Sequence, residues 1–214
     1  GMGLLSCQEC HMPTEFRPAA NGHPAREVHQ HTFRGVDLNL SNPVENTSQF
    51  DIASELLESA ITLEINPPSS VESGDSLEIP IIVTSLTAHS LPSGVSFARE
   101  AWLEIVVTNR DNITDTLYQS GVIPKDSTSL DIYNDLDLLL FTSYLIDESG
   151  ATTQLVMKVS SIINKSLMAF SSIIKTYKVK IPDEFQVGDE INIRARMRFR
   201  SFKPDILRRG GHHD

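Results

Sequence analysis

Beyond residue 60, the chain is built from short runs in which apolar and polar residues alternate, the period expected of half-buried β-strands. Turn-forming groups such as Pro67-Pro68 and Ser73-Gly74-Asp75 separate these runs. So many strands at short spacing predict a mainly β fold, an antiparallel immunoglobulin-like β-sandwich. The predicted strands are Ala60 to Asn66, Ser76 to Leu86, Trp102 to Asn109, Thr116 to Val122, Leu138 to Ile146, Thr152 to Ser160, Ile174 to Ile181 and Glu190 to Phe202.

The last predicted strand has the clearest alternation. One face is apolar and is predicted to pack into the core, while the other carries a ladder of guanidinium groups. The apolar face consists of Ile191, Ile193, Ala195, Met197 and Phe199, and the ladder consists of Arg194, Arg196, Arg198 and Arg200.

The first part of the chain has a different character. It is rich in turn signals, such as Asn21-Gly22 and Asn42-Pro43, and is predicted to be loop-rich. The one regular element predicted in this part is a helix over Ser48 to Ser59, with Ser48 as the N-cap. We therefore expect a loop-rich segment over 1–59, a β-sandwich domain over 60–207 and a tail over 208–214.

Composition narrows the classes of function. The chain has 214 residues, of which 40% are hydrophobic and 21% charged, as in ordinary globular proteins. Its net charge of −10 argues against nucleic acid or an anionic membrane surface as the main partner. No run approaches the roughly 18 apolar residues of a membrane span. We find no nucleophile–base set and no glycine-rich phosphate loop, so the sequence offers no support for an enzyme.

The two cysteines of the chain lie in one short motif, Cys7-Gln8-Glu9-Cys10-His11. Cys-x-x-Cys-His is the attachment pattern of a c-type haem. Two thiols at this spacing can each add to one haem vinyl group, and the following imidazole can reach the iron. A redox dithiol, half of a zinc site and a coincidence are the alternatives.

A haem held in this way has one further axial position. Met12 directly follows His11 and cannot reach the opposite face of the haem, and the other methionines are expected to fill the core. A second histidine is therefore favoured, and the haem is expected to be bis-His. His31, with Phe33 nearby to pack on the porphyrin, is the first candidate. His29 is the alternative, and His89 and His23 are further candidates.

A zinc site is a second interpretation, because Cys7, Cys10, His29 and His31 form a Cys2His2 set. However, a zinc finger of this type has three to five residues between its histidines, and zinc would leave His11 without a role. A chain made without haem-attachment machinery would lack haem c, and could bind a metal at these residues instead.

Three further motifs carry a family resemblance. Cys7 to Pro13, followed by His31-Thr32-Phe33-Arg34-Gly35, resembles the last haem segment of multihaem c-type cytochromes of the cytochrome c554-like kind. Ala88 to Gly94, Arg99 and Ala101 to Ile105 are similar to a signature of their C-terminal β-domain, and Phe199 to Pro204 resembles its closing strand. The resemblance implies that His11 is the proximal ligand, His31 the distal ligand and His89 an axial ligand of a further haem. This chain has one haem motif where such proteins carry several.

These observations predict an exported electron-transfer protein, or a fragment of a multihaem cytochrome. Its partners would be redox proteins or other haem segments, and covalent haem attachment implies a periplasmic or other extracytoplasmic location. The start of the chain has no signal-peptide pattern, so a signal peptide is expected to have been removed. The alternative is a β-sandwich binding or scaffold module whose N-terminal segment binds zinc, another metal or nothing.

Overall fold

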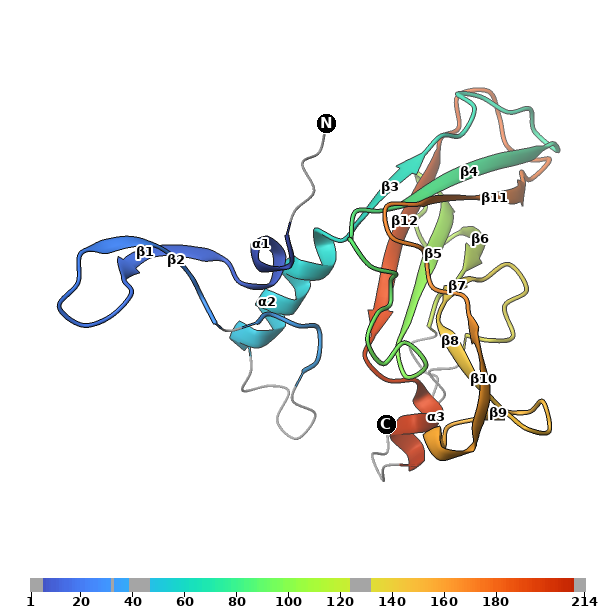
Figure 1. Ribbon diagram of the computed structural model, residues 1–214. Helices are drawn as coiled ribbons and strands as arrows, with labels where there is room; N and C mark the ends of the chain where they lie inside the picture. Colours follow the sequence, from blue (N-terminus) through green and yellow to red (C-terminus); the bar gives the residue numbers. More distant parts are fainter. Residues whose placement is uncertain (1–5, 32, 39–46, 124–131, 210–214) are drawn as a thin grey trace. The chain divides into compact units, whose positions relative to one another are not determined.

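The computed structural model describes residues 6–31, 33–38, 47–123 and 132–209 (Figure 1). The chain divides between Ala60 and Ile61 into two compact units, which are considered separately here. Of the tail predicted over 208–214, the part after residue 209 lies outside the described residues, as do His212 and His213.

The described residues of the first unit form two helices and one antiparallel hairpin (Figure 1). The elements are α1 (Cys7–His11), β1 (Thr14–Pro18), β2 (Ala25–His29) and α2 (Thr47–Glu58). The predicted helix is confirmed as α2, but Ser48 lies inside it and is therefore not its N-cap. The hairpin was not predicted, because nearly all of its residues are exposed and none is buried.

The second unit consists mainly of antiparallel strands, as the alternation predicted. One sheet has the order β11-β4-β3, a second has β12-β5-β6 with β7 also paired to β5, and a small third sheet has β10-β8-β9. The strands are β3 (Ile61–Ile65), β4 (Ser76–Ser85), β5 (Glu100–Asn109), β6 (Thr116–Ser120), β7 (Leu139–Phe141), β8 (Ser143–Asp147), β9 (Thr152–Thr153), β10 (Val159–Asn164), β11 (Ser172–Lys180) and β12 (Ile191–Arg200). A 3₁₀ helix, η2 (Val156–Lys158), and a terminal helix, α3 (Pro204–Arg209), complete the unit.

The core is formed by the apolar faces of the two larger sheets. Strand β4 contributes every second residue, from Leu77 to Val83, and β5 contributes Leu103, Ile105 and Val107, all of them buried. The mainly β fold is therefore confirmed. Burial alternates along β4, as the period-two pattern of a half-buried strand requires, whereas β5 is buried on both faces.

Trp102, near the start of β5, is a buried aromatic anchor. Its side chain is 2% exposed, and its indole Nε1 donates a hydrogen bond to the Gly121 carbonyl oxygen at 2.8 Å. Gly121 has a φ of +70°, and a Cβ placed there would lie 2.4 Å from the Leu103 carbonyl oxygen. Only glycine therefore fits beside Trp102.

Two predicted strands are divided in the structure. The run Leu138 to Ile146 breaks at the buried Thr142, whose hydroxyl donates to the Arg99 carbonyl oxygen at 2.8 Å. On either side of this residue, β7 pairs with β5 and β8 pairs with β10, so one apolar run serves two sheets. The run Thr152 to Ser160 is not one strand either, because the helix η2 follows β9 and β10 begins only at Val159.

The arginine ladder of β12 faces two buried carboxylates of β5. Glu104 is 2% exposed and accepts from Arg196 Nε at 2.6 Å and from Arg198 Nε at 2.8 Å. Glu100 is fully buried and accepts from Arg200 Nε at 2.7 Å and from the Tyr133 hydroxyl at 2.7 Å. Burial, together with the bond to Glu100, raises the pKa of the Tyr133 hydroxyl, which therefore stays protonated as a donor.

These ion pairs generate a stability prediction. Replacing Arg196 and Arg198 together by Gln should lower the free energy of unfolding by about 3 kcal/mol, because the Glu104 charge stays buried without its partners. Arg194→Gln is the matched control, since Arg194 is exposed and should change stability by less than about 0.5 kcal/mol. Urea denaturation measures both variants, and equal midpoints would show that Glu104 does not depend on its arginines.

Candidate functional site

The Cys-x-x-Cys-His motif forms a short helix, α1, with a capped N-terminus. Ser6 precedes it, and its side chain accepts a hydrogen bond from the Glu9 backbone N–H while the Glu9 carboxylate accepts from the Ser6 backbone N–H. The backbone bond from Ser6 is the main reason that the pKa of Glu9 is lowered. The spacing Ser6-x-x-Glu9 is a helix-start signal that the sequence analysis missed.

The helix places the two thiols together. Cys7 and Cys10 are three residues apart in a helix and therefore lie on one face. Both side chains are exposed, and neither forms a disulfide. The thiols are thus accessible on one side of α1 for addition to a haem.

His11, the last residue of α1, is held in one tautomer. Its Nδ1 lies 2.7 Å from the Arg34 carbonyl oxygen. A carbonyl oxygen can only accept, so Nδ1 carries the proton and Nε2 keeps its lone pair. Donation from one ring nitrogen to a backbone carbonyl is the usual arrangement of a histidine that ligates a metal through the other nitrogen.

The segment after β2 fixes the position of the His11 ring. The Arg34 N–H donates to the His11 carbonyl oxygen at 2.8 Å, so the two residues are joined in both directions. The Phe33 ring stacks on the imidazole, with 5.2 Å between centroids and 5° between planes. Arg34 also donates through Nη1 to Glu55 of α2 at 3.1 Å. Phe33 therefore packs on His11 itself, a role that its sequence position did not show.

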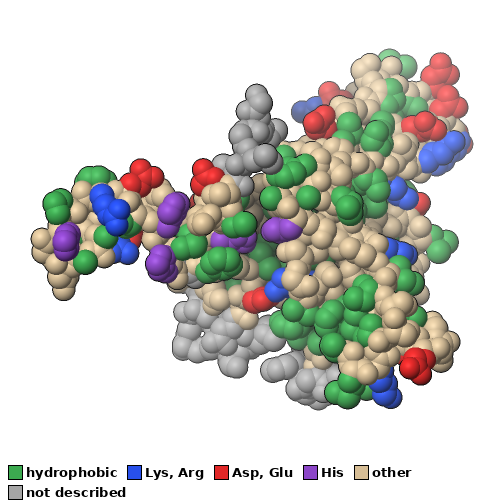
Figure 2. Space-filling model, in the orientation of Figure 1, with side chains coloured by type: hydrophobic (Ala, Val, Ile, Leu, Met, Phe, Trp, Pro, Cys, Tyr) green, Lys and Arg blue, Asp and Glu red, His purple; other side chains and the backbone are tan. Residues whose placement is uncertain are grey.

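Figure 2 shows histidine side chains at the surface of the first unit, and the candidates His29 and His31 differ in how they are held. His29, at the end of β2, has its Nδ1 2.8 Å from the Met12 carbonyl oxygen, so its Nε2 also keeps the lone pair. His31 is exposed and lies two residues after the end of β2. Among the described residues, no three side chains of the His, Cys, Asp or Glu type are grouped to hold a metal ion, so the Cys2His2 set is not assembled.

His89 lies in the second unit, in the connection between β4 and β5. It is exposed, and its Nδ1 lies 3.1 Å from the Ser90 carbonyl oxygen. The Leu91–Pro92 peptide bond that follows is cis. Arg99, which belongs to the same signature, donates through Nη1 to the Ser93 carbonyl oxygen at 2.8 Å. The role of His89 as an axial ligand stays a prediction.

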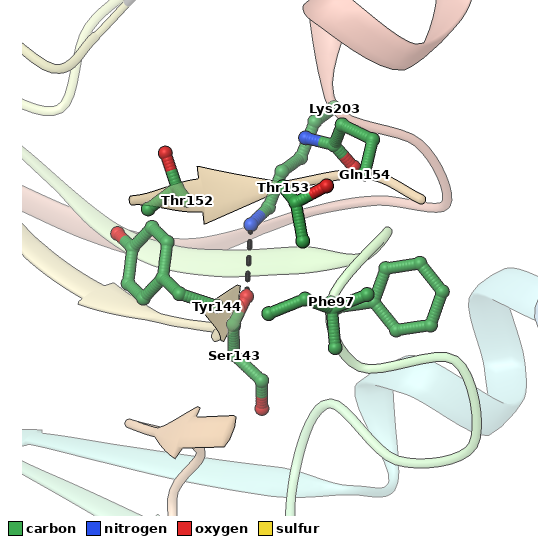
Figure 3. A pocket seen from close by; sticks show the side chains of 8 residues that line it. Phe97, Ser143, Tyr144, Thr152, Thr153, Gln154 and Lys203 are labelled. Atoms are coloured by element: carbon green, nitrogen blue, oxygen red, sulfur yellow. Dashed lines mark hydrogen bonds between the residues drawn. The ribbon is translucent and has the colours of Figure 1, made fainter. Parts of the chain in front are cut away.

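A small cavity in the second unit lies beside the buried Lys203, whose Nζ donates to the Ser143 carbonyl oxygen at 3.0 Å and lies 4.5 Å from the centre of the Tyr144 ring (Figure 3). Burial lowers the pKa of this ammonium group. The cavity, of about 20 Å³, has room for one water molecule. It is lined by Phe97, Ser143, Tyr144, Leu145, Thr152, Thr153, Gln154 and Lys203.

Comparison with known proteins identifies one solved structure with a similar fold. No protein-family model and no curated protein matches the chain. Among solved structures, the chain is similar to a penta-heme cytochrome c552 from Thermochromatium tepidum, with a TM-score of 0.64 and 16% sequence identity. The match covers 100% of this chain and 44% of that chain, so this chain spans less than half of its length. At this identity the likeness concerns the fold, which is shared with part of a multihaem c-type cytochrome. No helix among the described residues is long and apolar enough to cross a membrane.

The hydrogen bonds of His11 and His29 predict their tautomers in the haem-free protein. Long-range ¹H–¹⁵N spectra at a pH where imidazoles are neutral should show the Nδ1-protonated form for both. His23 is the control, because it is exposed and the structure gives its ring no hydrogen-bond partner. An Nε2-protonated His11 would contradict the bond to Arg34.

Proposed function

We propose that this chain binds one c-type haem covalently through Cys7 and Cys10, with His11 as the proximal ligand, and that it transfers electrons. The observation that carries the proposal is the 2.7 Å contact between His11 Nδ1 and the Arg34 carbonyl oxygen, which puts the proton on Nδ1 and so makes Nε2 the ring nitrogen that could ligate iron. The exposed thiols on the same helix supply the attachment points. The likeness in fold to part of a penta-heme cytochrome supports this assignment.

Several residues of the chain would each contribute to holding a c-type haem. Cys7 and Cys10 would form the thioether links, and the Ser6 cap keeps the helix that spaces them. The Arg34 carbonyl orients His11 and raises its basicity as a ligand, while Phe33 covers one face of the ring. Haem, when bound, supplies a reversible one-electron couple.

For the second axial position we propose His31. His31 is exposed and lies just before Phe33 and Arg34, both of which contact His11. His29 has the same kind of Nδ1 hydrogen bond to a backbone carbonyl oxygen as His11, and it stays the alternative ligand. Two histidine ligands would leave no open position for substrate, which fits electron transfer to partner redox proteins rather than catalysis. Covalent haem attachment fits an oxidising compartment, and we propose the periplasm or another extracytoplasmic location.

The attachment prediction uses the chain expressed with c-type haem-attachment machinery. The wild-type chain should show a Soret band and the mass of one haem, retained after denaturation on the peptide that contains Cys7 and Cys10. Cys7→Ser with Cys10→Ser should lose both signals, and Gln8→Ala, on the same helix, should keep them. A wild-type chain without added mass, beside a control cytochrome that gains it, would overturn the proposal.

The distal-ligand prediction compares two neighbouring histidines in the haem-loaded chain. His31→Ala should open one axial position, so that the reduced protein binds carbon monoxide, whereas His29→Ala should not. Visible spectra before and after addition of the gas measure both variants. Carbon monoxide binding in His29→Ala but not in His31→Ala would reverse the assignment, and His89→Ala tests the remaining candidate.

A further inference from the structure

The outer face of β12 carries positive charge beyond what its partners neutralise. Arg196 and Arg198 share a single carboxylate, that of Glu104, and Arg194 lies one position further along the same face of β12. Strand β12 runs beside β5, which carries Glu104 (Figure 1). Opposite Arg194 on β5 is Val106, which brings no charge. Arg194, Arg196 and Arg198 therefore meet one glutamate, on a chain whose net charge is −10.

Glu104 holds the two guanidinium groups in a way that leaves donors free. Each arginine uses its Nε for the buried carboxylate, and within the described residues the terminal amino groups of Arg196 and Arg198 have no other partner. The two side chains are 44% and 39% exposed, so these amino groups are accessible. Glu104 itself is 2% exposed, so a buried negative charge holds the guanidinium groups of Arg196 and Arg198 in place.

The neighbouring arginine shows what a neutralised position looks like. The Arg200 side chain is 12% exposed, pairs with Glu100 and lies over the rings of Trp102 and Tyr133, at 5.1 and 5.9 Å from their centres. The Arg200 side chain is therefore part of the packed structure of the sheet. On the described part of this face of β12, the accessible positive charge is thus that of Arg194, Arg196 and Arg198.

We propose that Arg194, Arg196 and Arg198 form a docking surface for clustered carboxylates on an acidic partner polypeptide. A guanidinium edge binds a carboxylate through two parallel hydrogen bonds, and Glu104 has already ordered two of the three side chains, which lowers the entropy cost of binding. An extended polyanion would experience the net charge of −10, whereas a local carboxylate cluster responds mainly to charges within about 10 Å. This surface does not depend on haem.

The test uses the full chain and a short fluorescent oligoglutamate peptide, with binding followed by anisotropy at an ionic strength of about 0.1 M, where charges beyond about 10 Å are screened. Arg194→Glu should weaken binding about fivefold or more and leaves the Glu104 pairs intact. Arg196→Lys with Arg198→Lys preserves the net charge, but each single ammonium is taken by Glu104, so this variant should also bind several-fold more weakly. Circular dichroism confirms that each variant is folded.

Lys180→Glu is the matched control. Lys180 is exposed at the end of β11, in the other large sheet, and the change in net charge equals that of Arg194→Glu. Peptide affinity should stay close to that of the wild type. Equal losses in the two charge reversals, or no binding of the peptide, would overturn the proposal. Tighter binding of inorganic phosphate or of phosphatidylglycerol vesicles that depends on Arg194 would replace the acidic polypeptide by a phosphate ligand.

Discussion

The second unit is organised around β5, a central strand whose two buried faces differ in chemistry. One face is apolar and faces the core, while the other carries Glu100 and Glu104, which need cationic partners because isolated buried carboxylates are strongly unfavourable. The partners come from β12, 92 to 100 residues later in the chain. Pairing of these two strands therefore satisfies the backbone and the buried charges at once, and it fixes their register.

The first unit also depends on interactions between polar groups that are far apart in the sequence and form hydrogen bonds with each other. Helix α1 is only five residues long, too short to be stable alone, and it is stabilised by its Ser6 cap and by the two hydrogen bonds between His11 and Arg34. The same bonds prepare His11 as a ligand. Structural support and candidate chemistry thus rest on the same contacts, and a change in the segment that follows β2 would affect both.

Sequence patterns predicted the parts of the fold in which burial alternates along one strand, as in β4 and β12. They failed where a residue acts through a distant backbone group. Thr142 interrupts an apolar run because its hydroxyl is bonded to Arg99, and the exposed β1–β2 hairpin has no apolar face to reveal it. The motif at Cys7 to His11 was visible from residue types alone, but the tautomer of His11 was not, because its partner is a carbonyl group 23 residues away.

The pairing of β5 with β12 also has an evolutionary consequence. A buried carboxylate and its guanidinium partners form one energetic unit, so losing either side alone costs much more than replacing both by apolar residues. We therefore expect correlated substitutions at positions 100, 104, 196, 198 and 200. Arg194 lies outside the network and can vary independently unless binding constrains it. Sequence covariation in this sheet would thus separate the residues retained for folding from those retained for an interaction.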